Sequence, residues 1–118
     1  DSVRRLLPQL RDPGFSKILI VTLPEATPVH EAARLQENLE RARIVPFGWV
    51  VNQSLPATGT EDAVLSSRAQ LENRYIEEVK TLTRNAFLVP WQAEAPRGTR
   101  ALLAMCAAKT PESIEVIT

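Results

Sequence analysis

Two adjacent amide side chains, Asn52 and Gln53, come directly after an apolar run that ends in Val50 and Val51. A side-chain amide offers both a hydrogen-bond donor and an acceptor, which is the combination needed to read the edge of a purine base. Local structure alone also explains the asparagine, because Asn at the end of a strand commonly closes an Asx-turn. The residues by themselves leave both interpretations open.

A carboxylate, Glu25, holds a similar place in LPEATP, after an earlier apolar run. Its oxygens could accept from a ligand hydroxyl, or its charge could favour the N-terminus of the helix that follows. Polar segments follow three apolar runs in all: LPEATP, NQSLPATG and PWQAEAPRG. Ligands of parallel sheets bind beyond the carboxyl ends of the strands, so these segments are predicted to form one wall of a site.

Residues for catalysis or metal binding do not form a recognisable set in the sequence. The four glycines are too scattered to build a glycine-rich phosphate loop. The single histidine, His30, is predicted to be a partly exposed first-turn residue of a helix. Cys106, the single cysteine, is predicted to be a buried small hydrophobic residue. These two residues lack the spacing of metal ligands, so neither catalytic residues nor a metal site is predicted.

The elements that must position these residues alternate between strand and helix. Apolar, β-branched runs predict three strands, at 17–23, 44–52 and 86–89, the first of them covered on both faces. Apolar residues at helical spacing predict helices at 1–11, 61–83 and 98–108, and another that begins at Pro28 with Thr27 as its N-cap. Two apolar stripes are expected to face the core: Ala32, Leu35, Leu39 and Ala42 in one helix, and Val64, Leu71, Tyr75, Val79 and Leu82 in the next.

This order predicts one α/β domain over residues 1–118. Strand-helix-strand units of about this length form right-handed crossovers, and these give a parallel sheet with flanking helices. Residues 109–118 are interpreted as either a terminal strand or a flexible tail. The sequence does not begin with Met, which suggests a processed product or a piece of a longer protein.

The charge balance limits the classes of partner. The chain has 14 Lys and Arg against 14 Asp and Glu, so it lacks the basic excess that nucleic acid or anionic lipid would attract. Its longest apolar run, 18–21, is far shorter than the roughly 20 residues that span a bilayer. A single cysteine cannot form an intrachain disulfide. We therefore expect a cytoplasmic protein with no nucleic-acid partner.

The segment KILIVTLPEATPVHEAARLQENLERARIVPFGWVVNQSL closely resembles the arsenical pump-driving ATPase family, whose eukaryotic relatives deliver tail-anchored proteins to membranes. The resemblance continues through SSRAQLENRYIEEVKTL and AFLVPWQAEAPRG. There the family has a similar RAQ-containing helix, a strand ending in LVP and an E-P-x-G turn. The resemblance covers about residues 10–103, in the family's order of motifs.

The resemblance implies a P-loop ATPase of the deviant Walker A kind, a dimer or pseudo-dimer with two nucleotides sandwiched at its interface. In this family the phosphate loop, the magnesium ligands and the D-T-A-P-T-G-H switch segment lie upstream of the matched region, and this sequence contains none of them. The chain is thus expected to be the C-terminal part of the fold, without the P-loop half.

The expected function is the adenine side of the nucleotide site in an ATPase that couples hydrolysis to transport or protein delivery. This chain alone is not expected to be catalytic or to bind a cofactor tightly, whereas the complete protein is expected to use ATP with magnesium. The expected partners are the N-terminal P-loop half or a homodimer partner, and a membrane transporter subunit. The alternative is a stand-alone, non-catalytic α/β module for binding or dimerisation.

The resemblance also suggests roles by position. Asn52 resembles the family's strand-end asparagine that hydrogen-bonds adenine, and Pro90, Trp91 and Gln92 resemble the loop that packs against the base. Glu25 resembles a carboxylate near the dimer interface that senses nucleotide.

Two positions depart from the family pattern. Arg43 stands where the family tends to have a glycine that ends a helix, so the usual left-handed cap is expected to be strained or replaced. Trp91 stands where smaller aliphatic residues are common, which leaves the shape of the base pocket open.

Overall fold

The computed structural model describes residues 2–107 and 115–117. These residues include four α-helices, α1 (Ser2–Arg11), α2 (Ala26–Arg41), α3 (Ala63–Leu82) and α4 (Gly98–Ala107). The strands are β1 (Leu19–Thr22), β2 (Gly48–Ser54), β3 (Ala86–Pro90) and β4 (Glu115–Ile117), and a 3-10 turn covers Pro56–Thr58. None of the helices in these ranges is long and apolar enough to cross a membrane.

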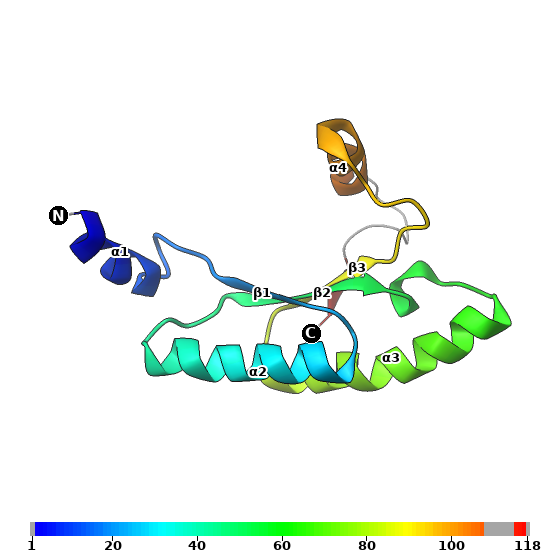
Figure 1. Ribbon diagram of the computed structural model, residues 1–118, viewed down its shortest axis with the longest axis horizontal. Coiled ribbons are helices and arrows are strands. Elements are labelled where there is room, and N and C mark those ends of the chain that lie inside the picture. Colours follow the sequence, from blue (N-terminus) through cyan, green and yellow to red (C-terminus); the bar gives the residue numbers. More distant parts are fainter. Residues whose placement is uncertain (1, 108–114, 118) are drawn as a thin grey trace.

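The strands form one sheet in the order β1-β2-β3-β4. The first three are parallel, and β4 runs antiparallel to β3. Helices α2 and α3 lie along one face of this sheet, while α4 stands on the opposite side (Figure 1). The predicted α/β fold with a parallel sheet and flanking helices is confirmed. Of the C-terminal segment, residues 115–117 form a strand; the rest of 109–118 lies outside the described residues.

The core fills the space between the sheet and the helices α2 and α3. Trp49 is fully buried there, between Ile20 of β1 and Ala86 of β3, its partners in register. Its indole Nε1 donates to Gln36 Oε1 over 2.6 Å, and Gln36 Nε2 donates to the carbonyl of Leu82 over 3.0 Å. One hydrogen-bonded chain therefore connects β2 to both covering helices.

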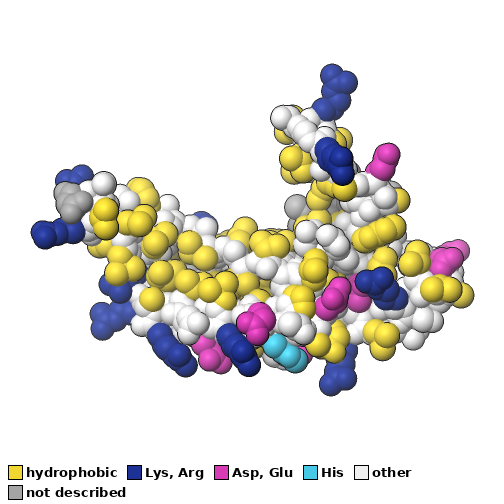
Figure 2. Space-filling model, viewed as in Figure 1, with side chains coloured by type: hydrophobic (Ala, Val, Ile, Leu, Met, Phe, Trp, Pro, Cys, Tyr) yellow, Lys and Arg dark blue, Asp and Glu magenta, His cyan; other side chains and the backbone are white. Residues whose placement is uncertain are grey.

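The other face of the sheet is only partly covered by the described residues. In β1, exposed and buried side chains alternate, with Leu19 47% and Val21 63% exposed. Hydrophobic side chains gather along this side, between α1 and α4 (Figure 2). The prediction that this strand is covered on both faces is wrong for this structure, because both packed helices lie on the same side.

The helices differ in detail from the sequence predictions. Helix α2 begins two residues before Pro28, and Glu25 rather than Thr27 is its N-cap. Pro28 then lies in the first turn, where its missing N–H loses nothing because first-turn amides have no partner within the helix. Among the predicted core residues, three are largely exposed instead: Leu35, Val64 and Leu71. In α3 the buried side chains are Glu72, Ile76 and Val79, so the core-facing stripe is rotated from the predicted one.

The departure at Arg43 is visible in the backbone. Arg43 adopts a left-handed φ of 60°. Its amide donates to the carbonyl of Glu40 at 2.9 Å, and the Ile44 amide donates to the carbonyl of Leu39 at 2.8 Å. These two bonds make a Schellman cap, the ending usually built on glycine. The cap is therefore kept, although Arg43 carries a side chain and the left-handed backbone disfavours residues other than glycine.

Candidate functional site

Strand β2 carries a bulge at its carboxyl end. The register pairs Val51 with Leu88 and then Ser54 with Pro90, so Asn52 and Gln53 lie opposite a single residue of β3. Gln53 has a left-handed φ of 55°. A bulge bends the strand and changes the direction of its side chains. The strand thus continues two residues beyond its predicted end, with the two amides in the irregular part.

Hydrogen bonds hold the backbone that follows the bulge on both sides. The amide of Trp91 donates to the carbonyl of Ser54 over 3.0 Å, which extends the pairing with β3. The amide of Leu55 donates to Glu72 Oε2 of α3, also over 3.0 Å. The bulge is therefore fixed to a neighbouring strand and to a helix below the sheet.

Asn52 and the segment after β3 border one cleft of about 390 Å³, which we call the amide cleft. Its lining residues are Asn52, Gln53, Val89, Pro90, Trp91, Gln92, Ala93, Ala95, Pro96 and Met105. All four residues assigned to the base by resemblance, from two separate segments, line this cleft. Met105 of α4 was not predicted; its position among leucines and alanines gave no signal for a site residue.

The Asn52 side chain is partly exposed and makes no hydrogen bond to any other described residue. It therefore does not close the Asx-turn that was the alternative explanation. It also borders a groove beside β1, together with Thr22 and Leu23. Across the amide cleft, Trp91 is 42% exposed, and Gln92 Nε2 donates to the carbonyl of Pro90 over 3.3 Å.

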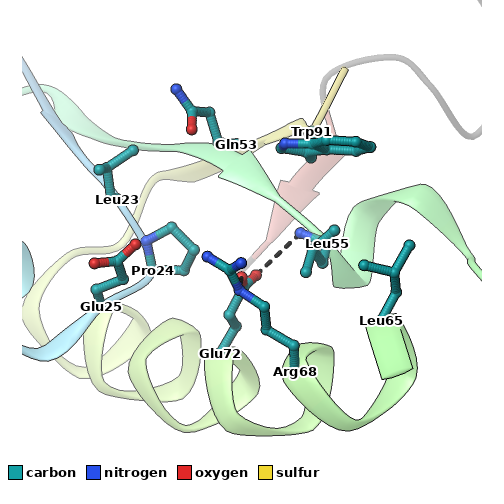
Figure 3. Close-up of a pocket in the computed structure, with 9 residues that line it drawn as sticks. All are labelled: Leu23, Pro24, Glu25, Gln53, Leu55, Leu65, Arg68, Glu72 and Trp91. Atoms are coloured by element: carbon teal, nitrogen blue, oxygen red, sulfur yellow. Dashed lines mark hydrogen bonds and ion pairs between the residues drawn. The ribbon is translucent and has the colours of Figure 1, made fainter. Parts of the chain in front are cut away.

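A smaller cavity of about 110 Å³ lies on the helix side of the same sheet edge; we call it the carboxylate cavity (Figure 3). Its lining residues are Leu23, Pro24, Glu25, Gln53, Leu55, Leu65, Arg68, Glu72 and Trp91. All three predicted loops meet here, and Gln53 and Trp91 border both spaces. Glu25 lies in this cavity and outside the amide cleft, with no side-chain hydrogen bond to the N-terminus of α2.

Glu72 was missed by the sequence analysis. It is 5% exposed, and burial raises the pKa of its carboxyl, while the Leu55 amide and the charge of Arg68 oppose that rise and the charge of Glu25 adds to it. The distance from Arg68 Nε to Glu72 Oε1 is 3.6 Å. The signal available in the sequence was its spacing, because Glu72 lies on the same face of the helix as Ile76 and Val79.

Neither of the two residues considered for metal binding lines the amide cleft or the carboxylate cavity. His30 Nε2 is 3.1 Å from Glu78 Oε1, and its ring meets Tyr75 edge-on. Cys106 is exposed, so the prediction of a buried cysteine is wrong; α4 buries none of its described residues. Within 2–107 and 115–117, no three His, Cys, Asp or Glu residues are grouped to hold a metal ion.

The amide cleft combines the features that suit a flat heteroaromatic ligand. Asn52 offers a donor and an acceptor, Trp91 an exposed aromatic ring, and the proline and alanine side chains an apolar lining. Such a combination of apolar walls and a few polar groups is typical of small-molecule sites.

Comparison with known proteins gives a consistent match. The model of the anion-transporting ATPase family matches residues 1–108. An arsenical pump-driving ATPase of Acidiphilium multivorum is 50% identical over 95 residues, which are 80% of this chain and 16% of that protein. One from Escherichia coli is 50% identical over 90 residues, 75% of this chain and 15% of that protein. The ATPase ARSA2 of Chlamydomonas reinhardtii is 27% identical over 107 residues. The chain spans about 16% of the length of the first relative.

Proposed function

The chain belongs to the anion-transporting ATPase family, and on that premise we propose that its amide cleft binds the adenine ring of ATP. The observation that carries the proposal is the meeting of Asn52 with Pro90, Trp91 and Gln92 around one cleft. The Asn52 amide can donate to and accept from adjacent atoms of the adenine edge. Trp91, which is 42% exposed, supplies the surface on which a planar ring packs, and the fully buried Pro90 supports the segment from beneath.

The complete protein, in this proposal, is an ATPase that couples ATP hydrolysis to transport or protein delivery. Its curated relatives carry the name arsenical pump-driving ATPase, and this chain spans about 16% of the length of the first of them. The phosphates and magnesium would be held by residues outside these 118, in the same protein or a second copy. This chain alone would then provide base recognition without hydrolysis. A membrane transporter subunit is the proposed downstream partner.

Glu25 takes a separate role in this proposal. It lies at the N-cap of α2, in the carboxylate cavity rather than beside Asn52. A carboxylate at that place does not contact the base. We assign it to the interface where a second nucleotide-binding unit would approach, as a residue that responds to the bound nucleotide.

The test replaces Asn52 by alanine in the complete protein and measures ATP and GTP dissociation constants by calorimetry. ATP affinity is expected to fall by about 1–3 kcal/mol, because base atoms lose their partner on binding. GTP affinity should change less. Asn73→Ala, the same replacement on an exposed part of α3, is the matched control and should leave both constants unchanged. Equal losses for ATP and GTP, or no loss, would contradict base reading by Asn52.

A second titration distinguishes the proposed function from the alternative, a stand-alone binding module. The 118-residue chain is expected to bind ATP far more weakly than the complete protein, because most nucleotide contacts in phosphate-loop proteins go to the phosphates. Equal affinity of the two proteins for ATP would contradict the assignment of the phosphate site to residues outside this chain.

A further inference from the structure

A buried carboxylate lies directly beneath the backbone that presents Asn52. Glu72 projects from α3 toward the sheet, and its Oε2 accepts from the Leu55 amide at 3.0 Å (Figure 3). The side chain is 7% exposed. Leu55 is itself 4% exposed. Glu72 is the acceptor that pairs this donor.

The bulge above Glu72 is in a conformation that the chain does not favour by itself. Gln53 has a side chain and yet adopts a φ of 55°, a region that glycine enters more easily. Bonds to the two following residues hold it there, from Trp91 to Ser54 and from Leu55 to Glu72. Without the second bond, the Leu55 amide would be buried and unpaired, a state that folded proteins avoid.

A change in the bulge would alter the backbone beside Asn52. A bulge bends its strand and shifts the pairing of the residues that follow, so losing it would change how the end of β2 lies against β3 and Trp91. Asn52 is the first of the two residues in the irregular part of β2. Regular alternation after the buried Val51 already turns Asn52 to the face away from α2 and α3, and the bulge sets its position relative to Trp91 across the amide cleft.

We propose that Glu72 is a positioning residue for base recognition, which holds the Leu55 amide and thereby fixes the bulge that sets Asn52 in its position relative to Trp91 in the amide cleft. The inference rests on the proposed function of that cleft. Glu72 itself lines the carboxylate cavity and not the amide cleft, so it acts through the backbone and not by touching the base.

Two substitutions separate the reach of the side chain from its charge. Glu72→Gln keeps the length and still offers a carbonyl oxygen to the Leu55 amide, but loses the charge. Glu72→Asp keeps the charge but is one methylene shorter, so its carboxylate no longer reaches that amide. If Glu72 works by holding the amide, the aspartate variant should be the impaired one.

The experiment measures the ratio of GTP to ATP dissociation constants by calorimetry in the complete protein. Glu72→Asp is expected to lower the preference for ATP about tenfold, the equivalent of one lost hydrogen bond to the base. Glu72→Gln should stay within about twofold of the unsubstituted protein. Glu78→Asp shortens another glutamate of α3, one that pairs with His30 away from both spaces, and should leave the ratio unchanged.

The outcomes distinguish this inference from the function on which it rests. If Asn52→Ala removes the ATP preference and Glu72→Asp does not, the positioning role is wrong and the base site stands. Equal loss in the aspartate and glutamine variants would also overturn it, since charge and not reach would then matter. If Asn52→Ala itself leaves the preference unchanged, the proposed base site fails, and the role of Glu72 fails with it.

Discussion

The two sides of the sheet are built differently. On the side of α2 and α3, Trp49 is fully buried and its indole N–H is paired, and even the carboxylate of Glu72 has a backbone partner. On the side of α4, Val21 is 63% and Trp91 42% exposed, and Asn52 has no hydrogen-bond partner among the described residues. The side of α2 and α3, where the buried polar groups are paired, contains the core of the fold. The side of α4, which we call the open side, holds the groups available to a ligand.

The largest expected effect tests this difference with one substitution on each side. Trp49→Ala should destabilise the chain by about 3–5 kcal/mol, because it empties a closed space and leaves the Gln36 oxygen without its donor. Val21→Ala, its control on the open side, should cost less than about 1 kcal/mol, because its side chain already meets solvent. Urea denaturation of the 118-residue chain measures both. Similar losses at the two positions would mean that the open side is packed in solution.

A smaller effect concerns the charge of Glu72, which is buried on the side of α2 and α3. Burial raises the pKa of Glu72, so the folded state holds its proton more tightly than the unfolded state does. The contribution of this group to stability is then complete below the ordinary pKa of 4.5 and is lost as pH rises through the raised value. Glu25 and Arg68 are the charged groups that the carboxylate meets.

Glu72→Gln removes that dependence and keeps the acceptor. Its stability relative to the unsubstituted chain should therefore be higher at pH 7 than at pH 4. Urea midpoints at the two pH values are the measurement, with Glu77→Gln as control at an exposed position of the same helix. A relative stability that rises on acidification instead would show that Arg68 and the Leu55 amide stabilise the ionised carboxylate more than burial penalises it.

The sequence predicted where the strands and helices lie better than which of their faces are buried. The strands at β1, β2 and β3 were predictable because apolar, β-branched runs bounded by proline and polar residues have few other uses. Burial on both faces of β1 was a wrong prediction, since it depends on elements that an apolar run does not specify. Cys106 was wrongly placed in the core for the same reason: an apolar helix is not buried unless something packs against it.

The candidate site was also predictable only in part. The grouping of Asn52 with Pro90 and Trp91 followed from the family resemblance, and the common cleft is visible in the structure. The bulge was not predictable, because Gln53 is not a glycine and its left-handed backbone is held by bonds to Trp91 and Glu72 that are distant in sequence. Glu72 was missed because a glutamate on a charged helix usually faces solvent.

The most direct test of the central claim is a crystal structure of the complete protein with ADP and magnesium. Our account predicts that the adenine ring lies in the amide cleft, with the Asn52 amide about 3 Å from an atom of the base edge and the ring packed against Trp91. It would be contradicted by a base bound elsewhere, or by an Asn52 side chain turned away from a base that occupies the cleft.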